Sequence, residues 1–465
     1  MTIFGSFEIG RKALRAQHKG MEVSGQNVAN ANTPGYTRQR TDMESVVAPM
    51  VKNPSMAPGR GVVVADVVRV RSEFYHKQLI STTSNKEYWD TRYETFLGAE
   101  AIFMEPEDYG INKYLNDFFD SWQELSSSPE EASVRAGLRE NAISLTRTVQ
   151  DVYHRLDDQI ENLENELSMI VNDVNRISDT IAELNEKIRF IDTMQEKSNE
   201  LFDQLDLAIE ELAELVNINV HRQANGTVEI FSGGRLLVQE DRSFHVSLGD
   251  GGEKGLQVVS SRGLPLQLNS GKVKGLLDAV NEDLPGLQNE LNKLITVLVK
   301  DFNELHRQGY AYDSDKTGID FFKPMDNKGV PAAMAFAVSD AIIEDGSNIA
   351  AANVAFAPGN GNNSLEIARL RDLKSPDRLG GASISDYYQA MITSMGVEAQ
   401  DSERMVGAFE KTLGQLQEMH ESISGVNIDE EMLNMVQYQH SWHAAARYLN
   451  YVDQMLGVLF TELGR

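Results

Sequence analysis

The longest regular pattern in this chain is LDDQIENLENELSMIVNDVNRISDTIAELNEKIRFI, residues 156–191. Its apolar residues alternate in steps of four and three, and they are Leu156, Ile160, Leu163, Leu167, Ile170, Val174, Ile177, Ile181, Leu184, Ile188 and Ile191. Such a stripe is typical of a helix that packs along its whole length. The register continues at Phe202, Leu205, Ile209, Leu212 and Val216, after polar Gln195 and Ser198 at two intervening positions. The pattern predicts one long helix, a break near residues 195–200 and a shorter helix.

The C-terminal segment carries a second stripe of the same kind. Its members, again in steps of three and four, are Met435, Tyr438, Trp442, Ala445, Leu449, Val452, Leu456 and Leu459. Asn427 precedes the acidic residues 429–431, an order that suits the N-cap and first turn of a helix. We therefore expect a helix over 428–465 with one regular apolar face.

The N-terminal segment repeats every seventh residue, at Phe7, Leu14, Met21 and Val28. Small or polar residues stand three positions after each of these, at Gly10, Gln17, Ser24 and Ala31. This spacing predicts a helix with a narrow apolar face that admits close neighbours. The helix should end within NANTPGY, residues 30–36, because Pro34 cannot continue it and Pro34-Gly35 suits the centre of a type II turn.

Further helical patterns cover 72–100, 110–125, 130–150, 284–307 and 384–424, an extended stretch covers 61–70, and short β-rich runs divided by glycine turns cover 218–269. The expected fold is mainly α with an inserted β-rich module, paired terminal coiled-coil helices, a long helical rod domain and an outer β domain. The expected domains are an N-terminal coil with an extended turn region (1–71), a helical rod domain in three parts (72–215, 284–309 and 366–427), a β-rich outer module (216–283), an outer irregular or β-rich module (310–365) and a C-terminal coil helix (428–465).

Composition narrows the possible functions of the 465 residues. The net charge of −27 opposes binding to nucleic acid or to anionic lipid, and the lack of cysteine excludes disulfides and thiolate metal sites. No apolar run is long enough to span a bilayer, and the first ten residues do not have the pattern of a cleavable secretory signal. Residues 1–40 carry net charge +4 and residues 426–465 carry −3, which either favours pairing of the two ends or is accidental.

Two stretches resemble ion sites. His440 and His443 stand three residues apart, but no third ligand is adjacent, so a solvated or packed pair is the simpler interpretation. Residues 313–320 resemble the start of a calcium loop, yet Pro324 stands where such a loop needs a bidentate Glu, which favours a polar turn. No phosphate loop, His-Glu-x-x-His pair or nucleophile elbow is present. We expect no cofactor, no metal and no enzymatic activity.

The ends of the chain also carry a recognisable signature. SGQNVANANTPGYTRQ, residues 24–39, together with Ala13-Leu14, closely resembles the N-terminal motif of bacterial flagellar axial proteins, the rod, hook and hook-associated proteins. SISGVNIDEE, residues 422–431, followed by Tyr438-Gln439 and the AAAR run at 444–447, resembles the hook-associated protein 1 family of hook–filament junction proteins. Interior stretches at 320–322, 358–365 and 384–388 agree with this resemblance, whereas 216–365 departs most from it.

The resemblance implies a structural subunit that polymerises at the distal end of the hook and joins hook to filament. It implies export to the extracellular flagellum without a cleaved signal peptide. The implied partners are further copies in a ring, the hook protein, the neighbouring filament-side junction protein and a cytosolic export chaperone. The expected assembly residues are the two terminal stripes and the turn residues Asn27, Asn30, Thr33, Pro34, Gly35 and Tyr36. The alternatives are another axial protein, hook or distal rod, or an adhesin-like binding module carried on the flagellum.

The terminal stripes also suggest why the protein would polymerise. One narrow stripe per helix buries too little apolar surface to offset the loss of conformational entropy on ordering the two ends. Neighbouring subunits could bury further faces. We therefore expect residues 1–35 and 428–465 to be mobile in the free monomer and ordered in the assembled tube.

Overall fold

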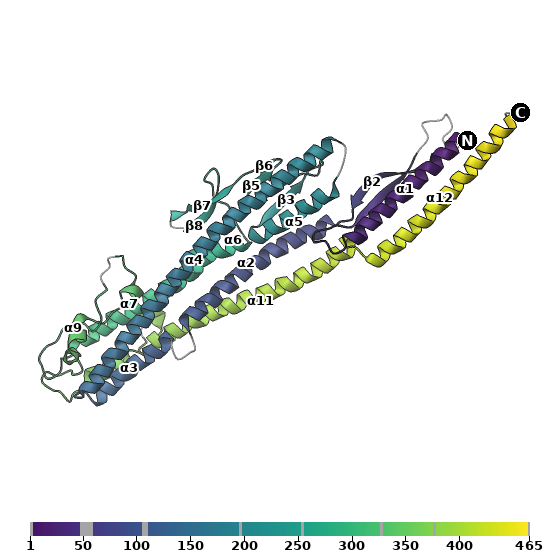
Figure 1. Cartoon of the computed structure of the whole chain (residues 1–465). Coiled ribbons are helices and arrows are strands. Elements are labelled where there is room, and N and C mark those ends of the chain that lie inside the picture. Colours follow the sequence, from purple (N-terminus) through teal and green to yellow (C-terminus); the bar gives the residue numbers. More distant parts are fainter. Residues whose placement is uncertain are drawn as a thin grey trace. The chain divides into compact units, whose positions relative to one another are not determined.

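A computed structural model describes residues 3–46, 59–104, 110–194, 198–252, 255–325, 329–374 and 378–463 (Figure 1). The helices longer than two turns are α1 (Ile3–Ala29), α2 (Glu73–Phe103), α3 (Ile111–Ser127), α4 (Ala132–Thr193), α5 (Asn199–Leu215), α7 (Leu284–Gln308), α10 (Asn362–Arg369), α11 (Ile384–Ser424) and α12 (Ile428–Leu463). The strands are β1 (Gln39–Ser45), β2 (Val62–Arg69), β3 (Ile218–Arg222), β4 (Val228–Ser232), β5 (Arg235–Gln239), β6 (Arg242–Ser243), β7 (Val246–Asp250) and β8 (Leu256–Ser260). The expected mainly α fold with small inserted β elements is confirmed.

The chain forms two compact units. One unit comprises Met1–Thr83, Asn175–His245 and Phe409–Arg465, and we call it the terminal unit because it holds both ends of the chain. The other comprises Ser84–Val174 and Val246–Ala408, and we call it the central unit. The borders fall within α2, α4 and α11, so the compact units cut across the domain ranges expected from sequence.

The predicted long helix is α4, which ends at Thr193, and α5 begins at Asn199 after the predicted break. Most of the apolar stripe is buried, including Leu156, Leu167, Val174, Ile177, Ile181, Leu184 and Ile188. The helix is longer than the stripe, because the pattern at 130–150 continues into it without interruption. Side chains on its other faces, such as Glu161 and Glu164, are exposed, so α4 is a one-sided amphipathic helix.

An aromatic cluster forms the centre of the central unit's core. Its fully buried members are Phe118, Trp122, Phe302, Phe321, Phe322 and Phe336. Neighbouring rings lie 4.9–6.4 Å apart between centroids, for example 5.2 Å between Trp122 and Phe302 and 4.9 Å between Phe321 and Phe322. Tilted and edge-on pairs at these separations add to the stabilisation that burial alone provides.

Residues 310–365, expected to be an irregular or β-rich module, are irregular with short helices and are not β-rich where they are described. Where they are described, they contain isolated bridges rather than named strands, and short helices α8 (Ala332–Ala335), α9 (Asp340–Glu344), η4 (Gly346–Asn348) and α10. They supply three of the core phenylalanines. The glycine- and asparagine-rich composition concealed this role because the apolar residues are few and well separated.

Residues 246–283 also differ from expectation. The hairpin β7–β8 is followed by α6 (Lys272–Asp278), a π-helical turn η3 (Ala279–Asp283) and α7 without a break. The return helix thus starts at Lys272 instead of residue 284. Gly275 on α6 allows a close approach, since a Cβ there would lie 2.7 Å from Thr91 Cβ on α2.

The terminal unit contains a four-stranded antiparallel sheet in the order β3-β4-β5-β6. Its first two turns hold Gly226, Gly233 and Gly234 at positive φ, as the predicted glycine turns require. Asn185 of α4 anchors the sheet: its amide donates to the carbonyls of Val228 (2.9 Å) and Glu240 (2.8 Å), and its Oδ1 accepts from the Val228 N–H. The other β element is the antiparallel pair β1–β2, in which Gln39 is opposite Arg69.

Candidate functional site

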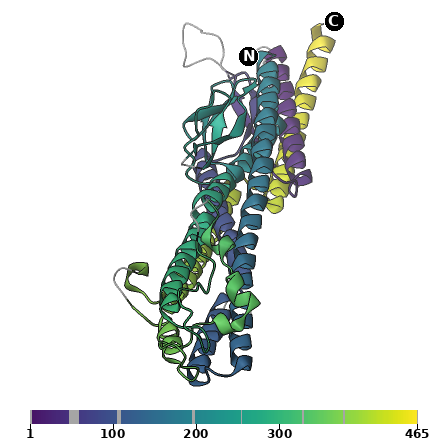
Figure 2. The same cartoon turned by 90° about the vertical axis from the view of Figure 1, so that its left-hand side faces the viewer.

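The two terminal helices, α1 and α12, lie side by side in the terminal unit (Figure 1 and Figure 2). Glycines on α1 mark the closest approach. A Cβ at Gly10 would lie 2.7 Å from Leu449 Cγ, and a Cβ at Gly20 would lie 2.7 Å from the Tyr438 ring. Glycine is therefore required at these positions for the helices to pack this closely.

The predicted stripe on α12 forms the face that packs inward. All its members whose side chains are described are buried or half-buried, namely Met435, Tyr438, Trp442, Ala445, Leu449, Val452 and Leu456. Leu459 lies in the helix, but its side chain is outside the described part of the structure. The predicted pairing of the terminal helices is confirmed, and the role of the stripe in assembly stays a prediction.

On α1 the buried face is made of smaller residues than the predicted stripe. Of the four apolar residues, Phe7 is exposed and Leu14, Met21 and Val28 are only half-buried. The buried positions are Gly10, Ala16, Gly20, Val23, Ser24 and Asn27. The small residues that repeat at Gly10 and Ser24 were thus the better guide to the packed face.

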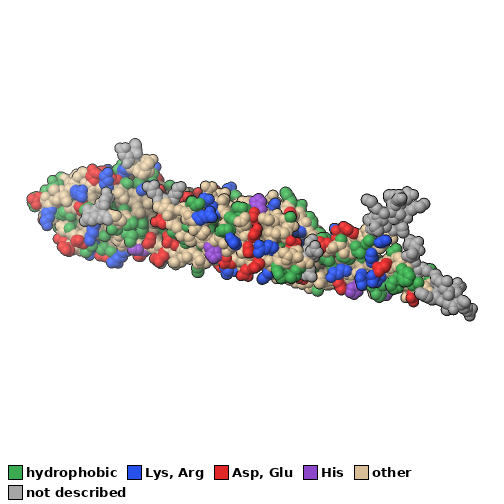
Figure 3. All heavy atoms as spheres, turned by 90° about the horizontal axis from the view of Figure 1, so that it is seen from above, with side chains coloured by type: hydrophobic (Ala, Val, Ile, Leu, Met, Phe, Trp, Pro, Cys, Tyr) green, Lys and Arg blue, Asp and Glu red, His purple; other side chains and the backbone are tan. Residues whose placement is uncertain are grey.

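A second apolar stripe runs along the back of α12. Its members lie in two groups, Leu433 and Val436 near the start of the helix and Tyr451, Met455 and Val458 near its end, and they are 45–64% exposed. Apolar side chains are visible on the surface of the terminal unit near the chain ends, on the right of Figure 3. A helix that is apolar on two opposite faces is normally buried on both. One chain covers only one of them.

The turn after α1 has the predicted form. The Tyr36 N–H donates to the Thr33 carbonyl at 3.2 Å, and Gly35 has φ of 75°, as the third position of a type II turn requires. The Thr33 hydroxyl donates to Asn30 Oδ1 at 3.2 Å. The Pro34-Gly35 turn therefore ends α1 and directs the chain into β1.

Asn27 joins α1 to the strand that follows. It is fully buried, and its amide donates to the Gln39 carbonyl at 2.9 Å while its Oδ1 accepts from the Gln39 N–H at 3.0 Å. The same oxygen accepts the Tyr36 hydroxyl at 2.8 Å. Burial, with the nearby Asp203 carboxylate, raises the pKa of Tyr36 to about 12, so the phenol keeps the proton that it donates.

Arg38 connects the N-terminal motif to the C-terminal motif. Its Nε donates to Glu431 Oε1 at 2.8 Å, its Nη1 lies 3.2 Å from Glu430 Oε2, and its backbone N–H donates to the Ser424 carbonyl. Asn427 Oδ1 caps α12 by accepting the N–H groups of residues 429 and 430. The two motifs quoted from the sequence are therefore two halves of one contact, and the expected attraction between oppositely charged ends is confirmed at Arg38.

Sequence reasoning missed a cluster of arginines elsewhere in the terminal unit. Arg69 of β2, Arg71 and Arg222 of β3 share the carboxylate of Asp206 on α5: Arg69 donates to Oδ2 at 2.8 Å, Arg71 donates to the same oxygen and Arg222 donates to Oδ1. Asp203 accepts a second bond from Arg69 at 2.9 Å. No local signal could reveal this cluster, because its members come from three separate segments, at residues 69–71, 203–206 and 222.

Arg71 is the least satisfied member of the cluster. Its side chain is 8% exposed, and within the described residues its Nε and Nη2 have no hydrogen-bond acceptor. Glu73 lies 3.5 Å from Arg71 Nε and 3.4 Å from Arg222 Nε, beyond good hydrogen-bond geometry. Burial, and then the charge of Arg222, lowers the pKa of Arg71 to about 10, against the opposing charges of Glu73 and Glu210.

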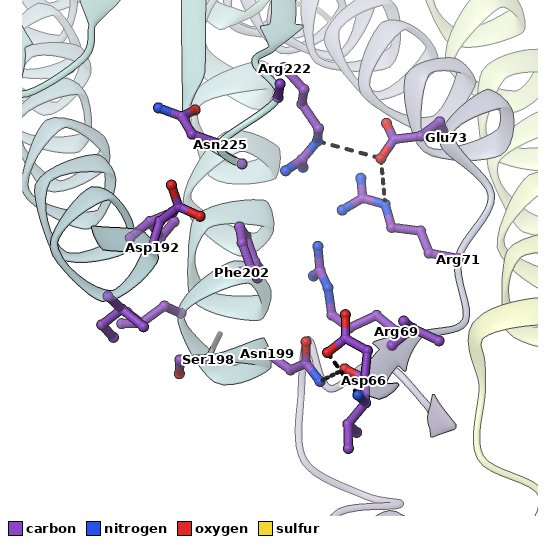
Figure 4. Close-up of a pocket in the computed structure, with 17 residues that line it drawn as sticks. Asp66, Arg69, Arg71, Glu73, Asp192, Ser198, Asn199, Phe202, Arg222 and Asn225 are labelled. Atoms are coloured by element: carbon purple, nitrogen blue, oxygen red, sulfur yellow. Dashed lines mark hydrogen bonds and ion pairs between the residues drawn. The ribbon is translucent and has the colours of Figure 1, made fainter. Parts of the chain in front are cut away.

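The three guanidinium groups border a cavity of about 400 Å³ (Figure 4). In the close-up they point toward a common space that Phe202 faces, and the Arg69 guanidinium carbon lies 5.1 Å from the centroid of the Phe202 ring. Ile188 and Ile191 of α4 add an apolar wall. The cavity thus combines a cationic side with an apolar one.

The two candidate ion sites from the sequence do not gather ligands. His440 and His443 are exposed, and His443 packs edge-on against Trp442. In the loop 313–320 the Thr317 hydroxyl donates to the Arg307 carbonyl, and Asp320 pairs with the Arg307 side chain at 2.6 Å. Among the described residues, no cluster of three acidic or histidine side chains could hold a metal, and no helix has the length and hydropathy to cross a membrane.

Known proteins match both the whole chain and its parts. Residues 98–322 match the family described as the flagellar hook-associated protein FlgK helical domain. Residues 7–37 match the flagella basal body rod protein family, and residues 419–461 match the flagellar basal body rod FlgEFG protein C-terminal family. The two rod-family matches cover the helices that pair in the terminal unit.

Curated relatives cover the full length. Flagellar hook-associated protein 1 of Bacillus subtilis is 30% identical over 100% of this chain and 99% of its own length. The protein of the same name from Escherichia coli is 23% identical over 96% and 97% of the two chains. The flagellar hook junction protein FlgK from Burkholderia pseudomallei has a similar fold, with a TM-score of 0.62, 16% identity and coverage of 75% of this chain and 100% of its own. This chain therefore belongs to the flagellar hook-associated protein 1 family.

Proposed function

We propose that this chain is a structural subunit that polymerises at the distal end of the flagellar hook and joins hook to filament through its terminal helix pair. One observation carries the proposal: α12 is apolar on two opposite faces, and α1 covers only one of them. Membership of a structural flagellar family supports it. The family match gives no sign of catalysis, and we propose that the chain is not an enzyme.

The geometry favours other copies of the chain, or related axial proteins, as the cover for the back of α12. The exposed stripe has members near both ends of α12, Leu433 and Val436 at one end and Tyr451, Met455 and Val458 at the other, which suits a second long helix better than a point contact. Burying a side chain of this size contributes about 1.5–3 kcal/mol. Several such contacts, repeated around a ring, would stabilise the ends far more than one chain can.

The remaining partners follow from the family. We propose contacts with the hook protein on one side and a neighbouring filament-side junction protein on the other, after delivery by a cytosolic export chaperone. Export would proceed without a cleaved signal peptide. The adhesin-like alternative stays a prediction, and it is weakened because three of the four phenylalanines of residues 310–365 lie in the core and only Phe356 is exposed.

The test replaces the chromosomal gene with variants and counts filaments. Deletion should leave hooks without filaments. Tyr451→Asp, which places a charge on the exposed stripe, should do the same although the purified protein stays folded. Gln439→Asp, also at an exposed position of α12 but off both stripes, serves as the matched control and should restore filaments. Normal filaments with Tyr451→Asp would remove the exposed stripe from assembly.

A further inference from the structure

We propose that the cavity beside Arg69, Arg71 and Arg222 is a binding site for a carboxylate that carries an apolar group. The site is separate from the surface assigned to assembly, and the inference does not rest on the proposed function. It uses residues of the terminal unit alone.

The guanidinium groups supply the recognition of the carboxylate. They belong to β2, the segment after β2, and β3, and in Figure 4 all three are directed toward the space in front of Phe202. Planar guanidinium donors match the two oxygens of a carboxylate, and pairs of this kind are shorter and stronger than neutral hydrogen bonds. Asp203 and Asp206, which accept from these arginines, are not among the residues that line the cavity.

Arg71 retains hydrogen-bond donors that its neighbours do not satisfy. Asp203 and Asp206 accept hydrogen bonds from the cluster, and Glu73 forms longer ion pairs with Arg71 and Arg222, yet Arg71 Nε and Nη2 are buried without a hydrogen-bond acceptor in the described part of the chain. Arg71 lines the cavity, and its side chain is more than nine-tenths buried. Buried charged donors normally find partners. A guest carboxylate would supply the hydrogen-bond acceptor that the buried nitrogens of Arg71 lack.

The rest of the lining specifies the kind of guest. Phe202, Ile188 and Ile191 form an apolar wall, and about 400 Å³ is enough for an aromatic or branched carboxylic acid. Asp66 and Asp192 also line the cavity, and Phe202 is drawn between Asp192 and Arg71 in Figure 4. Together with Glu73, which also lines the cavity, these carboxylates oppose guests of high negative charge. A singly charged carboxylate with an apolar body therefore fits better than inorganic phosphate.

A carboxylate of this kind has two possible sources: a free organic acid, or an acidic side chain of another protein subunit. Benzoate represents the first and N-acetylglutamate amide the second, because the latter presents a single side-chain carboxylate on a blocked backbone. Benzamide is the neutral analogue of benzoate. Inorganic phosphate tests whether the cavity accepts any oxyanion.

The experiment measures saturation-transfer NMR of each probe against the full-length protein, followed by titration to obtain Kd. Benzoate or N-acetylglutamate amide should bind saturably, and the one that binds identifies the source. Benzamide should not bind, and phosphate should bind at least tenfold more weakly than the preferred carboxylate. Arg222→Gln and Arg71→Gln should each raise Kd roughly tenfold or more, the loss expected for one charged hydrogen bond.

Arg242→Gln is the matched control, since Arg242 is an exposed arginine of the same sheet that does not line the cavity. It should leave Kd unchanged. Circular dichroism checks folding, and Arg222→Gln decides the result if Arg71→Gln does not fold. The proposal is overturned if neither carboxylate binds, if benzamide binds as well as benzoate, or if Arg222→Gln binds like wild type.

Discussion

Trp122 and Trp442 show how differently the two units use the same kind of residue. Trp122 is fully buried in the central unit, with the rings of Phe118, Phe302 and Phe321 around it. Trp442 is half-buried on a helix whose opposite face is still apolar. The first environment is complete within one chain, whereas the second has an uncovered apolar face.

The stripes of α4 and α12 have the same periodicity. Periodicity alone therefore does not distinguish a helix that packs within one chain from a helix that packs between chains. The difference lies on the opposite face. The back of α4 is mainly charged and polar, with Met169 and Phe190 as isolated exposed apolar residues, while the back of α12 carries Leu433, Tyr451 and Met455. A repeat tells which face packs first, and the composition of the other face tells whether a further partner is needed.

The largest expected difference between the two units is in the effect of the same new charge on the free energy of unfolding. Val174→Asp puts a carboxylate at a position that is 1% exposed, and it should lower the free energy of unfolding by about 3–5 kcal/mol, as unpaired buried charges do. Tyr451→Asp lies on an exposed face and should change it by about 0.5 kcal/mol or less. Urea denaturation of the monomer measures both. Equal losses would mean that the terminal helices are as closed as the core.

The stability of the central unit should also depend on pH through one buried histidine. His306 is fully buried in the central unit, where its Nδ1 bonds the Ile319 carbonyl at 2.7 Å and its Nε2 accepts the Ala350 N–H at 2.9 Å. Burial lowers the pKa of His306 to about 4, assisted by the charge of Arg135 and opposed by the Ile319 bond and Asp320. Between pH 6.5 and 4 the unfolded chain therefore binds a proton that the folded chain does not.

The contribution of His306 to the free energy of unfolding should consequently be complete above pH 6.5. The free energy of unfolding should fall by about 2 kcal/mol between pH 7 and pH 5. Denaturation at each pH, followed by the near-ultraviolet signal of the core tryptophan, measures the slope. His306→Gln lowers stability throughout but should flatten the slope over this range. An unchanged slope in that variant would assign the acid sensitivity to other groups.

The contact between the two ends should respond to a smaller change. Glu431 is 2% exposed and binds Arg38 at 2.8 Å, whereas the Glu430 side chain is 58% exposed and lies 3.2 Å from the same arginine. Glu431→Gln should weaken the contact by about 1.5–3 kcal/mol and Glu430→Gln by about 1 kcal/mol or less. Amide exchange at Arg38, whose N–H bonds the Ser424 carbonyl, reports the difference. Matching effects would show that burial of Glu431 is unimportant.

Local patterns predicted the helices and the turn, because a 3.6-residue repeat and Pro34-Gly35 act over a few residues. The ends of α11 and the start of α12 agree with the sequence pattern to the residue. Strand β1 was missed: its sequence QRTDMES is polar, and it is a strand because β2 pairs with it. The core role of Phe321 and Phe336 was missed for the same reason, since distant segments bring them together.

The candidate site divides in the same way. The motifs at residues 24–39 and 422–431 were visible, but the bond between Arg38 and Glu431 joins residues 393 positions apart in the chain. The residues that line the arginine cavity come from β2, β3, α4 and α5. The sequence of each segment alone is typical of an ordinary charged surface. Contacts of this separation depend on the tertiary fold and leave no local pattern.

The subtlest prediction concerns the closeness of the terminal helices and uses two glycines of α1. Alanine favours a helix over glycine by about 1 kcal/mol, so Gly25→Ala, where no atom lies within 4 Å of the new Cβ, should slow amide exchange in α1. Gly20→Ala gains the same propensity but places a Cβ 2.7 Å from the Tyr438 ring, which must move and separate the helices. We expect faster exchange in both α1 and α12 with Gly20→Ala, and no change in the central unit with either variant. If the two alanines acted alike, the helices would not be in close contact at Tyr438, and the small residues of α1 would have no role in holding the ends together.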